Sequence, residues 1–464
     1  MPDLWPAPRA GTVAGDINLP ASKSATNRLL ILGALSEKPT TLYSPLQAED
    51  TDLMVNGLRN LGVKIEQSDA AWKIYPAPLH GGKIYTGLAG TVMRFLLPLA
   101  GLASGESLFH CAEQAARRPI SPLITALKDL GIEVETAGNS SASAFPLRIK
   151  GRGEIQGGKI HLDAAASSQF ISALLLAAPR FQRGLELVAP APLPSFPYIE
   201  MTAHMLRQAG GKITELHSAE LNSTARAYHW RIAPSSLQVA AQKVEADLSN
   251  AGPFLAGAMV SGGKVRIANW PARSHQPGIS YREIFSQMGG KFSHCHCADH
   301  SGDLILTGPS TLKEIDIDCR AIGELVPTLA AVCAFASGTS YLRNIAHLRG
   351  HESDRLAALS SELAKIGVKA RIVGGTDLEI TPPRSQPTAA NLPNTPSLRG
   401  GAAPDIAERD IAAREIIIDA HNDHRLATFG AILGMRIAGI KIAGIEATAK
   451  TFPDFPRQWK EFCR

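Results

Sequence analysis

The sequence predicts an α/β protein of two domains, each built from three copies of one repeated unit. Three observations predict it. The chain has 464 residues, more than one hydrophobic core usually supports. A polar cluster, an apolar helix of about ten residues, a turn and a β-rich run recur along the chain. Several of these helices, such as 170–178 and 325–336, are apolar nearly all round, which predicts buried helices covered by sheets.

The copies of the apolar helix follow one another at nearly regular intervals. The first, NRLLILGALSEKPTTLYSP, turns at Lys38-Pro39. The turns of the other five contain Gly105, Gly184, Gly262, Gly338 and Gly439, which lie 79, 78, 76 and 101 residues apart. The last interval is about 25 residues too long, and a Pro-, Gly- and Ser-rich segment at about 383–413 accounts for the excess. We expect a loop or disordered insertion there.

A second helix-to-strand phrase alternates with the first. Its copies are LRNLGVKIE, LKDLGIEVE, LRQAGGKIT, FSQMGGKFS and LAKIGVKAR. Each repeat of about 75 residues is therefore expected to be a βαβαββ unit, with three units to a domain. The first three units end near Ala240, where APSSLQVAAQK is typical of a crossover.

Composition excludes several classes of protein. The net charge of +5 is mild and dispersed, which argues against nucleic acid and is compatible with small acidic ligands. The sequence contains neither an apolar run long enough to span a membrane nor a secretory leader pattern, so we expect a cytoplasmic protein. Six cysteines in a chain of this length do not indicate a disulfide framework.

The segment SHCHCADH could be a metal site. It contains His294, Cys295, His296, Cys297 and His300. Zinc motifs usually space their cysteines by two to four residues and in two pairs, which this segment does not do. We interpret it instead as part of an exposed β-hairpin between MGGKFS and GDLILTG.

Polar clusters recur where each buried helix begins. A helix N-terminus presents unpaired N–H groups and a positive dipole, and equivalent ends in a threefold repeat meet at one place. Arg28 and Arg94 lie inside apolar helix starts, where an unpaired charge would be costly. We therefore expect an anion site. The clusters are Lys23-Ser24 to Arg28, Gly90-Thr91 to Arg94, Ser167-Ser168-Gln169, Asn250-Ala251-Gly252, Gly323-Glu324 and Asn422-Asp423-His424-Arg425.

Eight motifs in order carry a family resemblance: LPASKSATNR, GLAGTVMR, RRPI, SSQF, PSFPYIEMT, RGHESDRL, NDHR and AKTFPDFP. Together they cover residues 19–456 and resemble the 3-phosphoshikimate 1-carboxyvinyltransferase (EPSP synthase) family. The resemblance implies two inside-out α/β domains, one formed by 21–240 and the other by 1–20 with 241–464, and an active site in the cleft between them. It also implies a monomer.

The implied reaction transfers the enolpyruvyl group of phosphoenolpyruvate to the 5-hydroxyl of shikimate 3-phosphate. Phosphate is released through a tetrahedral intermediate, and neither cofactor nor metal is expected. The substrates bring about six negative charges. Seven cations would balance them, namely Lys23, Arg28, Arg94, Arg118, Arg355, Arg425 and Lys450.

The resemblance also implies the ligand sets. Tyr198 would pack beside the shikimate ring. The residues implied for shikimate 3-phosphate are Lys23, Ser24, Arg28, Ser167, Ser168, Gln169, Ser195, Glu324 and His351. Those implied for phosphoenolpyruvate are Lys23, Gly90, Arg118, Gln169, Arg355, Arg425 and Lys450.

Three residues are implied as catalytic: Glu324, Glu352 and Lys23. Glu324 would accept the proton of the 5-hydroxyl, and Glu352 would deliver a proton to the methylene carbon. Two carboxylates in different environments suit such a division of acid and base roles. The alternative for Glu352 is a buried structural carboxylate that pairs with a neighbouring arginine.

Four positions depart from the best-known bacterial pattern. Glu324 replaces Asp, His351 replaces Lys, His347 replaces Asn, and Leu88 replaces the Asn of GNAGT. Together these departures resemble an actinobacterial branch of the family, which uses His at 351. Gly90 lies where sensitivity to glyphosate is often decided, and glycine leaves room beside phosphoenolpyruvate.

Two alternatives remain open. One is the sister enzyme that transfers enolpyruvate to UDP-N-acetylglucosamine, which uses a loop Cys five residues before an Arg-Pro. Here the nearest candidate, Cys111, precedes Arg118-Pro119 by seven residues and is interpreted as a small apolar strand-end residue. The other is a phosphate-ligand binding protein without turnover, against which the Glu324 and Glu352 pair argues.

Overall fold

The computed structural model divides the chain into two compact units. The C-terminal unit comprises the chain up to Leu19, Leu248–Arg349 and the chain from Ser353, and the N-terminal unit comprises Pro20–Asp247 with Gly350–Glu352. The chain therefore passes from the N-terminal to the C-terminal unit between Asp247 and Leu248, whereas the repeats suggested a boundary near Ala240. Of the insertion predicted at 383–413, all residues after Pro383 lie outside the described residues. The structure describes residues 4–136, 144–216, 227–296, 301–383 and 415–464.

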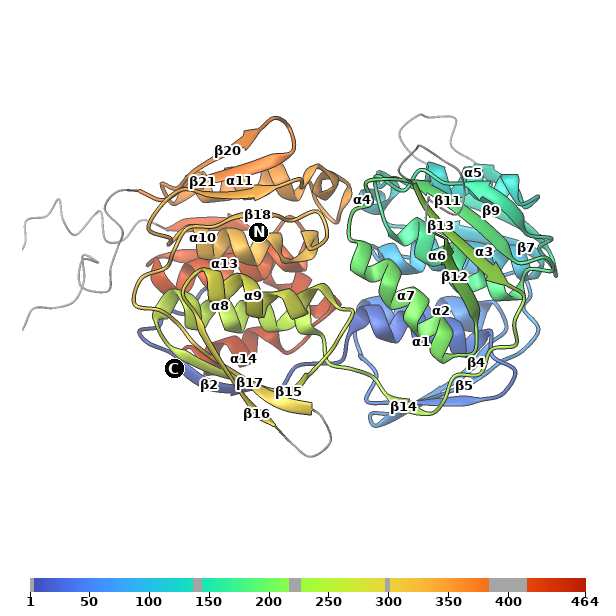
Figure 1. Ribbon diagram of the computed structural model, residues 1–464, viewed down its shortest axis with the longest axis horizontal. Helices are drawn as coiled ribbons and strands as arrows, with labels where there is room; N and C mark the ends of the chain where they lie inside the picture. Colours follow the sequence, from blue (N-terminus) through green and yellow to red (C-terminus); the bar gives the residue numbers. More distant parts are fainter. Residues whose placement is uncertain (1–3, 137–143, 217–226, 297–300, 384–414) are drawn as a thin grey trace, which may run out of the picture. The chain divides into compact units, whose positions relative to one another are not determined.

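The N-terminal unit alternates helices and strands in the predicted order (Figure 1). Its elements are α1 (Lys23–Ala34), β3 (Thr40–Tyr43), α2 (Glu49–Asn60), β4 (Lys64–Gln67), β5 (Ala71–Tyr75), β6 (Lys83–Tyr85), α3 (Gly90–Leu102), β7 (Ser104–His110), α4 (Glu113–Ala116), α5 (Ser121–Asp129), β8 (Glu133–Thr136), β9 (Leu147–Arg152), β10 (Gly158–His161), α6 (Gln169–Ala177), η1 (Ala178–Arg180), β11 (Leu185–Pro190), α7 (Phe196–Gln208), β12 (Lys212–Leu216), β13 (Ala227–Ala233) and β14 (Gln242–Lys243).

The C-terminal unit has the same alternation and contains both chain ends. Its elements are β1 (Leu4–Pro6), β2 (Ala14–Ile17), η3 (Leu248–Ala251), α8 (Gly252–Ser261), β15 (Lys264–Pro271), η4 (Pro277–Ser280), α9 (Tyr281–Gln287), β16 (Lys291–His296), β17 (Ser301–Thr307), β18 (Asp316–Asp318), η5 (Gly323–Leu325), α10 (Val326–Cys333), β19 (Ser340–Arg343), η6 (Ala346–Gly350), α11 (Arg355–Lys365), β20 (Lys369–Val373), β21 (Asp377–Thr381), β22 (Ile416–Asp419), α13 (His424–Arg436), β23 (Ile440–Ala443), η7 (Ile445–Lys450) and α14 (Phe455–Phe462).

Five of the six sheets share one topology. In the sheet β6-β7-β9-β8, β6 and β7 are parallel, β7 and β9 antiparallel, and β8 and β9 antiparallel. The same pattern holds in β14-β3-β5-β4, β10-β11-β13-β12, β18-β19-β21-β20 and, read from its other edge, β16-β17-β15-β2. The sixth sheet, β1-β23-β22, has three strands. The predicted fold class of repeated βαβαββ units is confirmed.

Two sheets take their first strand from a distant part of the chain. β14 pairs in parallel with β3, with Gln242 opposite Leu42. β2 pairs in parallel with β15, with Lys264 opposite Ala14. Before the crossings at 19/20 and 247/248, the chain therefore contributes a strand, β2 or β14, to a sheet of the unit that it is about to leave.

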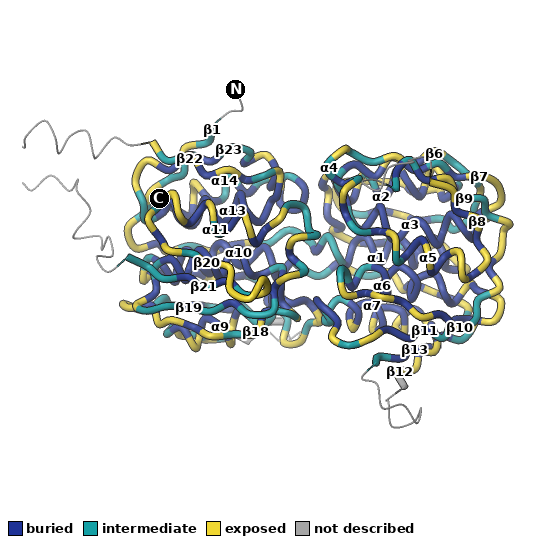
Figure 2. The backbone as a smooth tube through the Cα atoms, turned by 90° about the horizontal axis from the view of Figure 1, so that it is seen from above, coloured by how far each residue is buried: buried dark blue, intermediate teal, exposed yellow. Residues whose placement is uncertain are grey.

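Each unit has its own hydrophobic core around the buried helices. In the N-terminal unit α3 packs against α6, and in the C-terminal unit α13 packs against α8 and α10. Residues along these helices are buried at nearly every position, while the strands alternate buried and exposed residues (Figure 2). This is the pattern expected when sheets cover helices on the outside of a unit. Among the described residues, no helix combines the length and apolarity needed to cross a membrane.

Local features agree with the sequence patterns. Gly262 ends α8 with φ +65°, a left-handed conformation in which glycine avoids the steric cost of a Cβ. The hairpin interpretation of the SHCHCADH region is confirmed, because β16 and β17 pair antiparallel with His294 opposite Leu304. Cys297 and His300 lie outside the described residues.

Candidate functional site

Lys23 lies at the start of α1, one residue after the helix cap. The Ser22 hydroxyl accepts a hydrogen bond from the backbone N–H of Ala25 at 3.3 Å, which caps the helix. The Lys23 ammonium donates to the Asp50 carboxylate at 3.0 Å, with Asp50 almost fully buried. This pair holds the lysine near the entrance of α1, and Asp50 is a partner that the sequence did not reveal.

Arg118 is a buried cation with unused donors. It lies after α4, and 8% of the residue is exposed. Its Nη1 donates to the carbonyl oxygen of Leu88 at 2.7 Å. Its Nε and Nη2 are buried, and among the described residues they have no hydrogen-bond partner. Leaving guanidinium donors unsatisfied is costly, so this arrangement favours an anion that would accept from them.

A second buried arginine lies close by. Arg94, in the first turns of α3, donates from Nη1 to the side-chain oxygen Oε1 of Gln169 at 2.7 Å. Burial and then the charge of Arg118 lower the pKa of Arg94 to about 9. A Cβ on Gly90 would lie 3.1 Å from Arg94 Nη1, 3.2 Å from Gln169 Oε1 and 3.5 Å from Arg118 Nη1. Four residues that the sequence singled out are thus brought together at the N-termini of α3 and α6: Gly90, Arg94, Arg118 and Gln169.

Arg28 is bonded mainly to the protein itself. Its Nε donates to the Thr202 hydroxyl at 2.8 Å, and its Nη2 donates to the Tyr198 carbonyl at 3.2 Å and the Ser172 hydroxyl at 3.3 Å. Its Nη1 donates to the Ser24 carbonyl at 3.0 Å. One of the five guanidinium hydrogens remains for a ligand among the described contacts. Arg28 therefore ties α1 to α6 and α7 in addition to its implied binding role.

The predicted serines lie at the entrances of α6 and α7. Ser167 Oγ accepts from the backbone N–H of Gln169 at 3.3 Å, and Ser168 is the N-cap of α6. Ser195 is the N-cap of α7 and has φ +51°, an uncommon conformation for a residue with a side chain. The Tyr198 ring lies under the Arg28 guanidinium at 5.7 Å.

In the C-terminal unit, Asp423 organises the predicted arginines. Its carboxylate is fully buried and accepts from Arg355 Nε at 2.7 Å and Arg355 Nη2 at 3.1 Å. It also accepts from the Ser353 hydroxyl at 3.1 Å and caps α13 through the backbone N–H of Arg425 at 2.9 Å. The NDHR motif contained Asp423, but its anchoring role was not predicted.

Glu324 lies beside Arg425. The Glu324 Oε2 atom is 3.5 Å from Arg425 Nη2, and Arg425 Nη1 donates to the Asn250 side-chain oxygen at 3.2 Å. Lys450 is buried and donates to the Asn422 carbonyl. The structure therefore places Glu324 beside Arg425, a residue predicted to bind phosphoenolpyruvate. Asn250 also contacts Arg425.

His351 and Glu352 belong to the short segment Gly350–Glu352 of the N-terminal unit. The side-chain Nε2 of Gln114 donates to the Glu352 carbonyl at 2.8 Å, which anchors the backbone of the segment. This contact is made by the main chain of Glu352, not by its carboxylate. Gln114 was not singled out by the sequence.

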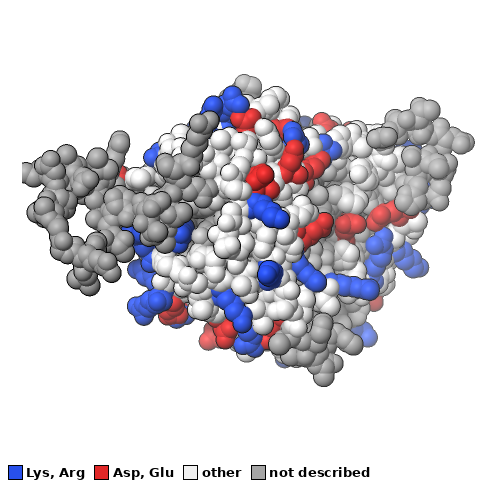
Figure 3. All heavy atoms as spheres, turned by 60° about the vertical axis from the view of Figure 1, so that its left-hand side comes forward, with Lys and Arg blue, Asp and Glu red and all other residues white. Residues whose placement is uncertain are grey.

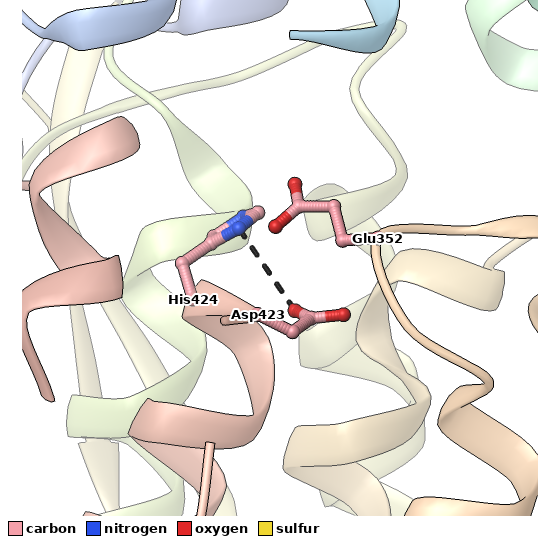
Figure 4. Close-up of side chains that lie close together, drawn as sticks. All are labelled: Glu352, Asp423 and His424. Atoms are coloured by element: carbon pink, nitrogen blue, oxygen red, sulfur yellow. Dashed lines mark ion pairs between the residues drawn. The ribbon is translucent and has the colours of Figure 1, made fainter. Parts of the chain in front are cut away.

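Metal-ligating residue types also occur near the predicted site. The side chains drawn in Figure 4 are Glu352, Asp423 and His424. The dashed line joins His424 Nδ1 to Asp423 Oδ1 at 4.0 Å. Because the Asp423 carboxylate already neutralises the buried Arg355 cation, a metal there would have to displace that pair. We therefore assign Asp423 to the arginines.

Cys111 is half-buried against the core of the N-terminal unit. Burial raises the pKa of its thiol to about 11. A thiol that stays protonated at neutral pH is a poor nucleophile. This environment supports the interpretation of Cys111 as a packing residue.

On the molecular face that Figure 3 shows, lysines and arginines stand among aspartates and glutamates. Many of the basic residues are paired, for example Arg266 with Asp303 and Arg371 with Glu379. Such mixed charges are typical of a solvated surface. Arg94 and Arg118 are instead buried, and neither pairs with a carboxylate among the described residues.

His347 packs against Gly323, the residue before Glu324. Burial, then the charges of Arg355 and Arg320, lower the pKa of His347 to about 4. Since an unfolded histidine titrates near 6.5, the unfolded chain binds an extra proton between these values, and stability falls as the pH drops. Between pH 7 and pH 4 we expect His347 to cost about 3 kcal/mol of unfolding free energy.

Urea unfolding of the wild type and of His347→Asn at both pH values measures this cost. The variant should lose less stability on acidification than the wild type. Equal losses in the two proteins would contradict the expectation.

The sequence comparisons show one family, and solved structures of low sequence identity share its fold. The sequence model of EPSP synthase (3-phosphoshikimate 1-carboxyvinyltransferase) matches residues 8–459. A 3-phosphoshikimate 1-carboxyvinyltransferase of Kocuria rhizophila is 41% identical over 478 aligned residues, covering 99% of this chain and 96% of the relative. An EPSP synthase structure from Acinetobacter baumannii has a TM-score of 0.72 at 24% identity, covering 99% of this chain and 98% of the other. The enolpyruvyl transferase NikO from Streptomyces tendae has a TM-score of 0.68 at 14% identity, covering 99% and 97%.

Proposed function

The chain belongs to the EPSP synthase (3-phosphoshikimate 1-carboxyvinyltransferase) family, and from this premise we propose how its residues carry out the reaction. The enzyme transfers the enolpyruvyl group of phosphoenolpyruvate to the 5-hydroxyl of shikimate 3-phosphate, and phosphate leaves. The observation that carries our assignment of residues is the buried guanidinium of Arg118, whose Nε and Nη2 have no partner among the described residues.

Phosphoenolpyruvate binds beside Arg94 and Arg118, two buried arginines that have no carboxylate partner among the described residues. Arg118 donates to it through Nε and Nη2, and the missing side chain of Gly90 leaves room beside the two arginines. Lys23 reaches both substrates from the start of α1. The N-termini of α3 and α6 add partial positive charge at the same end of the unit. Arg355, Arg425 and Lys450 supply the further cations from the C-terminal unit.

Shikimate 3-phosphate binds to donors at the entrances of α1, α6 and α7. The hydroxyls of the predicted serines and the remaining N–H of Arg28 suit a phosphate and a carboxylate. His351 donates a hydrogen bond to this substrate. The members of this set are Lys23, Ser24, Arg28, Ser167, Ser168, Gln169, Ser195, Glu324 and His351.

The acid–base steps use two carboxyl groups. Glu324 removes the proton of the 5-hydroxyl, whose oxygen bonds to C2 of phosphoenolpyruvate, and Glu352 protonates the C3 methylene. The resulting tetrahedral intermediate returns a C3 proton and expels phosphate, which restores the double bond. Lys23 and the arginines stabilise the developing charge throughout. Arg425 lies beside Glu324 and keeps this base close to the cations that hold phosphoenolpyruvate.

We further propose that the enzyme works in the cytoplasm as a monomer. Four cysteines, Cys111, Cys319, Cys333 and Cys463, are free thiols, which a reducing compartment maintains. Size-exclusion chromatography with light scattering should give the mass of one 49.3 kDa chain. A larger mass at working concentration would overturn the monomer.

A phosphate-release assay tests the function directly. The purified protein should release phosphate only when both phosphoenolpyruvate and shikimate 3-phosphate are present. UDP-N-acetylglucosamine in place of the acceptor should give no release, and Cys111→Ala should keep full activity. Release with the sugar nucleotide, or loss of activity in the cysteine variant, would favour the sister enzyme instead.

Two neighbouring arginines test the assigned anion site in the same assay. Arg118→Met should raise the KM for phosphoenolpyruvate by about 10- to 100-fold, because it removes charge-assisted donors. Arg117→Met is the matched control, since Arg117 is exposed and pairs with Glu113. Equal effects of the two substitutions would reject the assignment of Arg118.

A further inference from the structure

Arg94 is a buried arginine that donates two hydrogen bonds, both to the protein, while its Nε has no partner among the described residues. Only 4% of it is exposed, and its guanidinium lies over the Phe170 ring at 5.3 Å. Its Nη2 donates to the Pro119 carbonyl at 3.0 Å, and its Nη1 donates to Gln169 Oε1 at 2.7 Å. Within the described residues no carboxylate pairs with it. Its charge is therefore held at the entrance of α3 by neutral groups.

The bond to Gln169 determines which way the amide faces. The oxygen and nitrogen of a glutamine side chain are nearly alike in shape, so the hydrogen-bond network decides their positions. A guanidinium only donates, so the atom facing Arg94 must be Oε1. The Gln169 Nε2 atom, with its two hydrogens, then has no other acceptor among the described residues and remains for a ligand.

The contact to Pro119 joins Arg94 to the loop that contains Arg118. Pro119 follows Arg118, whose Nη1 is anchored on Leu88 at 2.7 Å. The point where a Cβ of Gly90 would lie is within 3.5 Å of Arg94, Gln169 and Arg118. One guanidinium thus links the first residue of α6 to the loop that carries the unpartnered donors of Arg118.

We propose that Arg94 is a positioning residue that holds Oε1 of Gln169 inward, so that Nε2 donates to the anionic substrate beside Gly90. The inference rests on the proposed function, since that substrate is phosphoenolpyruvate. Arg94 does not touch the substrate itself. This differs from the role expected from charge balance alone, in which Arg94 was one of seven cations facing the substrates.

A double-mutant cycle tests the proposal. Arg94→Met and Gln169→Ala should each raise the KM for phosphoenolpyruvate by about 10- to 100-fold, more than they lower kcat. In the double variant the KM should stay within about threefold of Gln169→Ala alone, because Arg94 has no amide left to orient. Multiplicative effects of the two substitutions would overturn the proposal.

Gln169→Glu separates positioning from structural support. A carboxylate keeps an acceptor for Arg94 and adds an ion pair, so the variant should unfold at or above the wild-type temperature. It places an oxygen where Nε2 donated and repels the substrate, so its KM should rise at least as far as that of Gln169→Ala. Wild-type affinity in Gln169→Glu would show that Nε2 does not donate to the substrate.

Two controls keep the experiment decisive. Arg94→Lys retains the charge and guards against a failure of Arg94→Met to fold, and it should still raise the KM because one ammonium cannot span Gln169 and Pro119 as the planar guanidinium does. Arg207→Met, on the surface of α7 with an ion pair to Glu215, should behave as wild type. If wild-type protein releases no phosphate, the proposed function fails; if it is active and the cycle is multiplicative, only the role of Arg94 fails.

Discussion

Glu324→Gln should lower kcat by about 10²- to 10⁴-fold, the usual loss when a positioned general base is removed. Glutamine has nearly the same shape as glutamate and can still accept a hydrogen bond from Arg425, 3.5 Å away in the native pair. It cannot accept the proton of the 5-hydroxyl at neutral pH. The KM for phosphoenolpyruvate should therefore change much less than kcat.

Steady-state and single-turnover phosphate release measure this split. Glu314→Gln is the matched control, because Glu314 is an exposed carboxylate of the same unit that bonds to Ser337. A rise in KM with kcat preserved would mean that Glu324 serves only to hold Arg425. The pH profile of kcat should lose its acidic limb in Glu324→Gln and keep it in Glu314→Gln.

Asp423→Ala should lower the free energy of unfolding by about 3–5 kcal/mol, the range found when one partner of a buried ion pair is removed. Asp423 is fully buried and accepts from Arg355 and Ser353, and it caps α13. Without it the buried Arg355 guanidinium loses the carboxylate that accepts from its Nε and Nη2. The KM for phosphoenolpyruvate should rise as well, because Arg355 loses its orientation.

Anion rescue distinguishes this account from a loss of packing. Inorganic phosphate should raise the unfolding midpoint of Asp423→Ala more than that of the wild type, because an anion restores charge beside Arg355. Asp454→Ala, which removes an exposed partner of Arg457, should change stability by less than about 1 kcal/mol and respond to phosphate as wild type does. Equal responses of Asp423→Ala and the wild type to phosphate would count against a loss of negative charge beside Arg355.

The repeat could be predicted from the sequence because its signals are local. Apolar helices, turn glycines and the second helix-to-strand phrase lie within single units, and three of the observed sheets, β6-β7-β9-β8, β10-β11-β13-β12 and β18-β19-β21-β20, follow that order throughout. The pairing of β14 with β3 could not be predicted in this way, because the partners lie about 200 residues apart and Gln242–Lys243 carries no strand pattern. The repeat boundary near 240 therefore stops short of the observed crossing after Asp247.

The residues of the site could be predicted from the sequence, but the hydrogen bonds and ion pairs between them could not. The motifs name Lys23, Gly90 and Arg118, yet nothing in them says that Lys23 pairs with Asp50 or that Arg94 bonds to Gln169. The bond between Arg94 and Gln169 joins different repeats, and both contacts depend on side-chain packing at distances of about 3 Å. Charge balance counted every buried cation as a ligand, whereas the structure commits four guanidinium hydrogens of Arg28 and two of Arg94 to the protein.

The strand exchange at the two crossings also affects how the chain folds as it is synthesised. The first sheet of the N-terminal unit lacks the edge strand beside β3 until Lys243 has left the ribosome, and β2 has no partner until Lys264–Ile267 follow. Contacts of such long sequence separation form slowly and leave an open edge in the meantime. A fragment ending at 240 would keep that edge exposed, so the shortest piece expected to fold as a closed unit extends to Asp247.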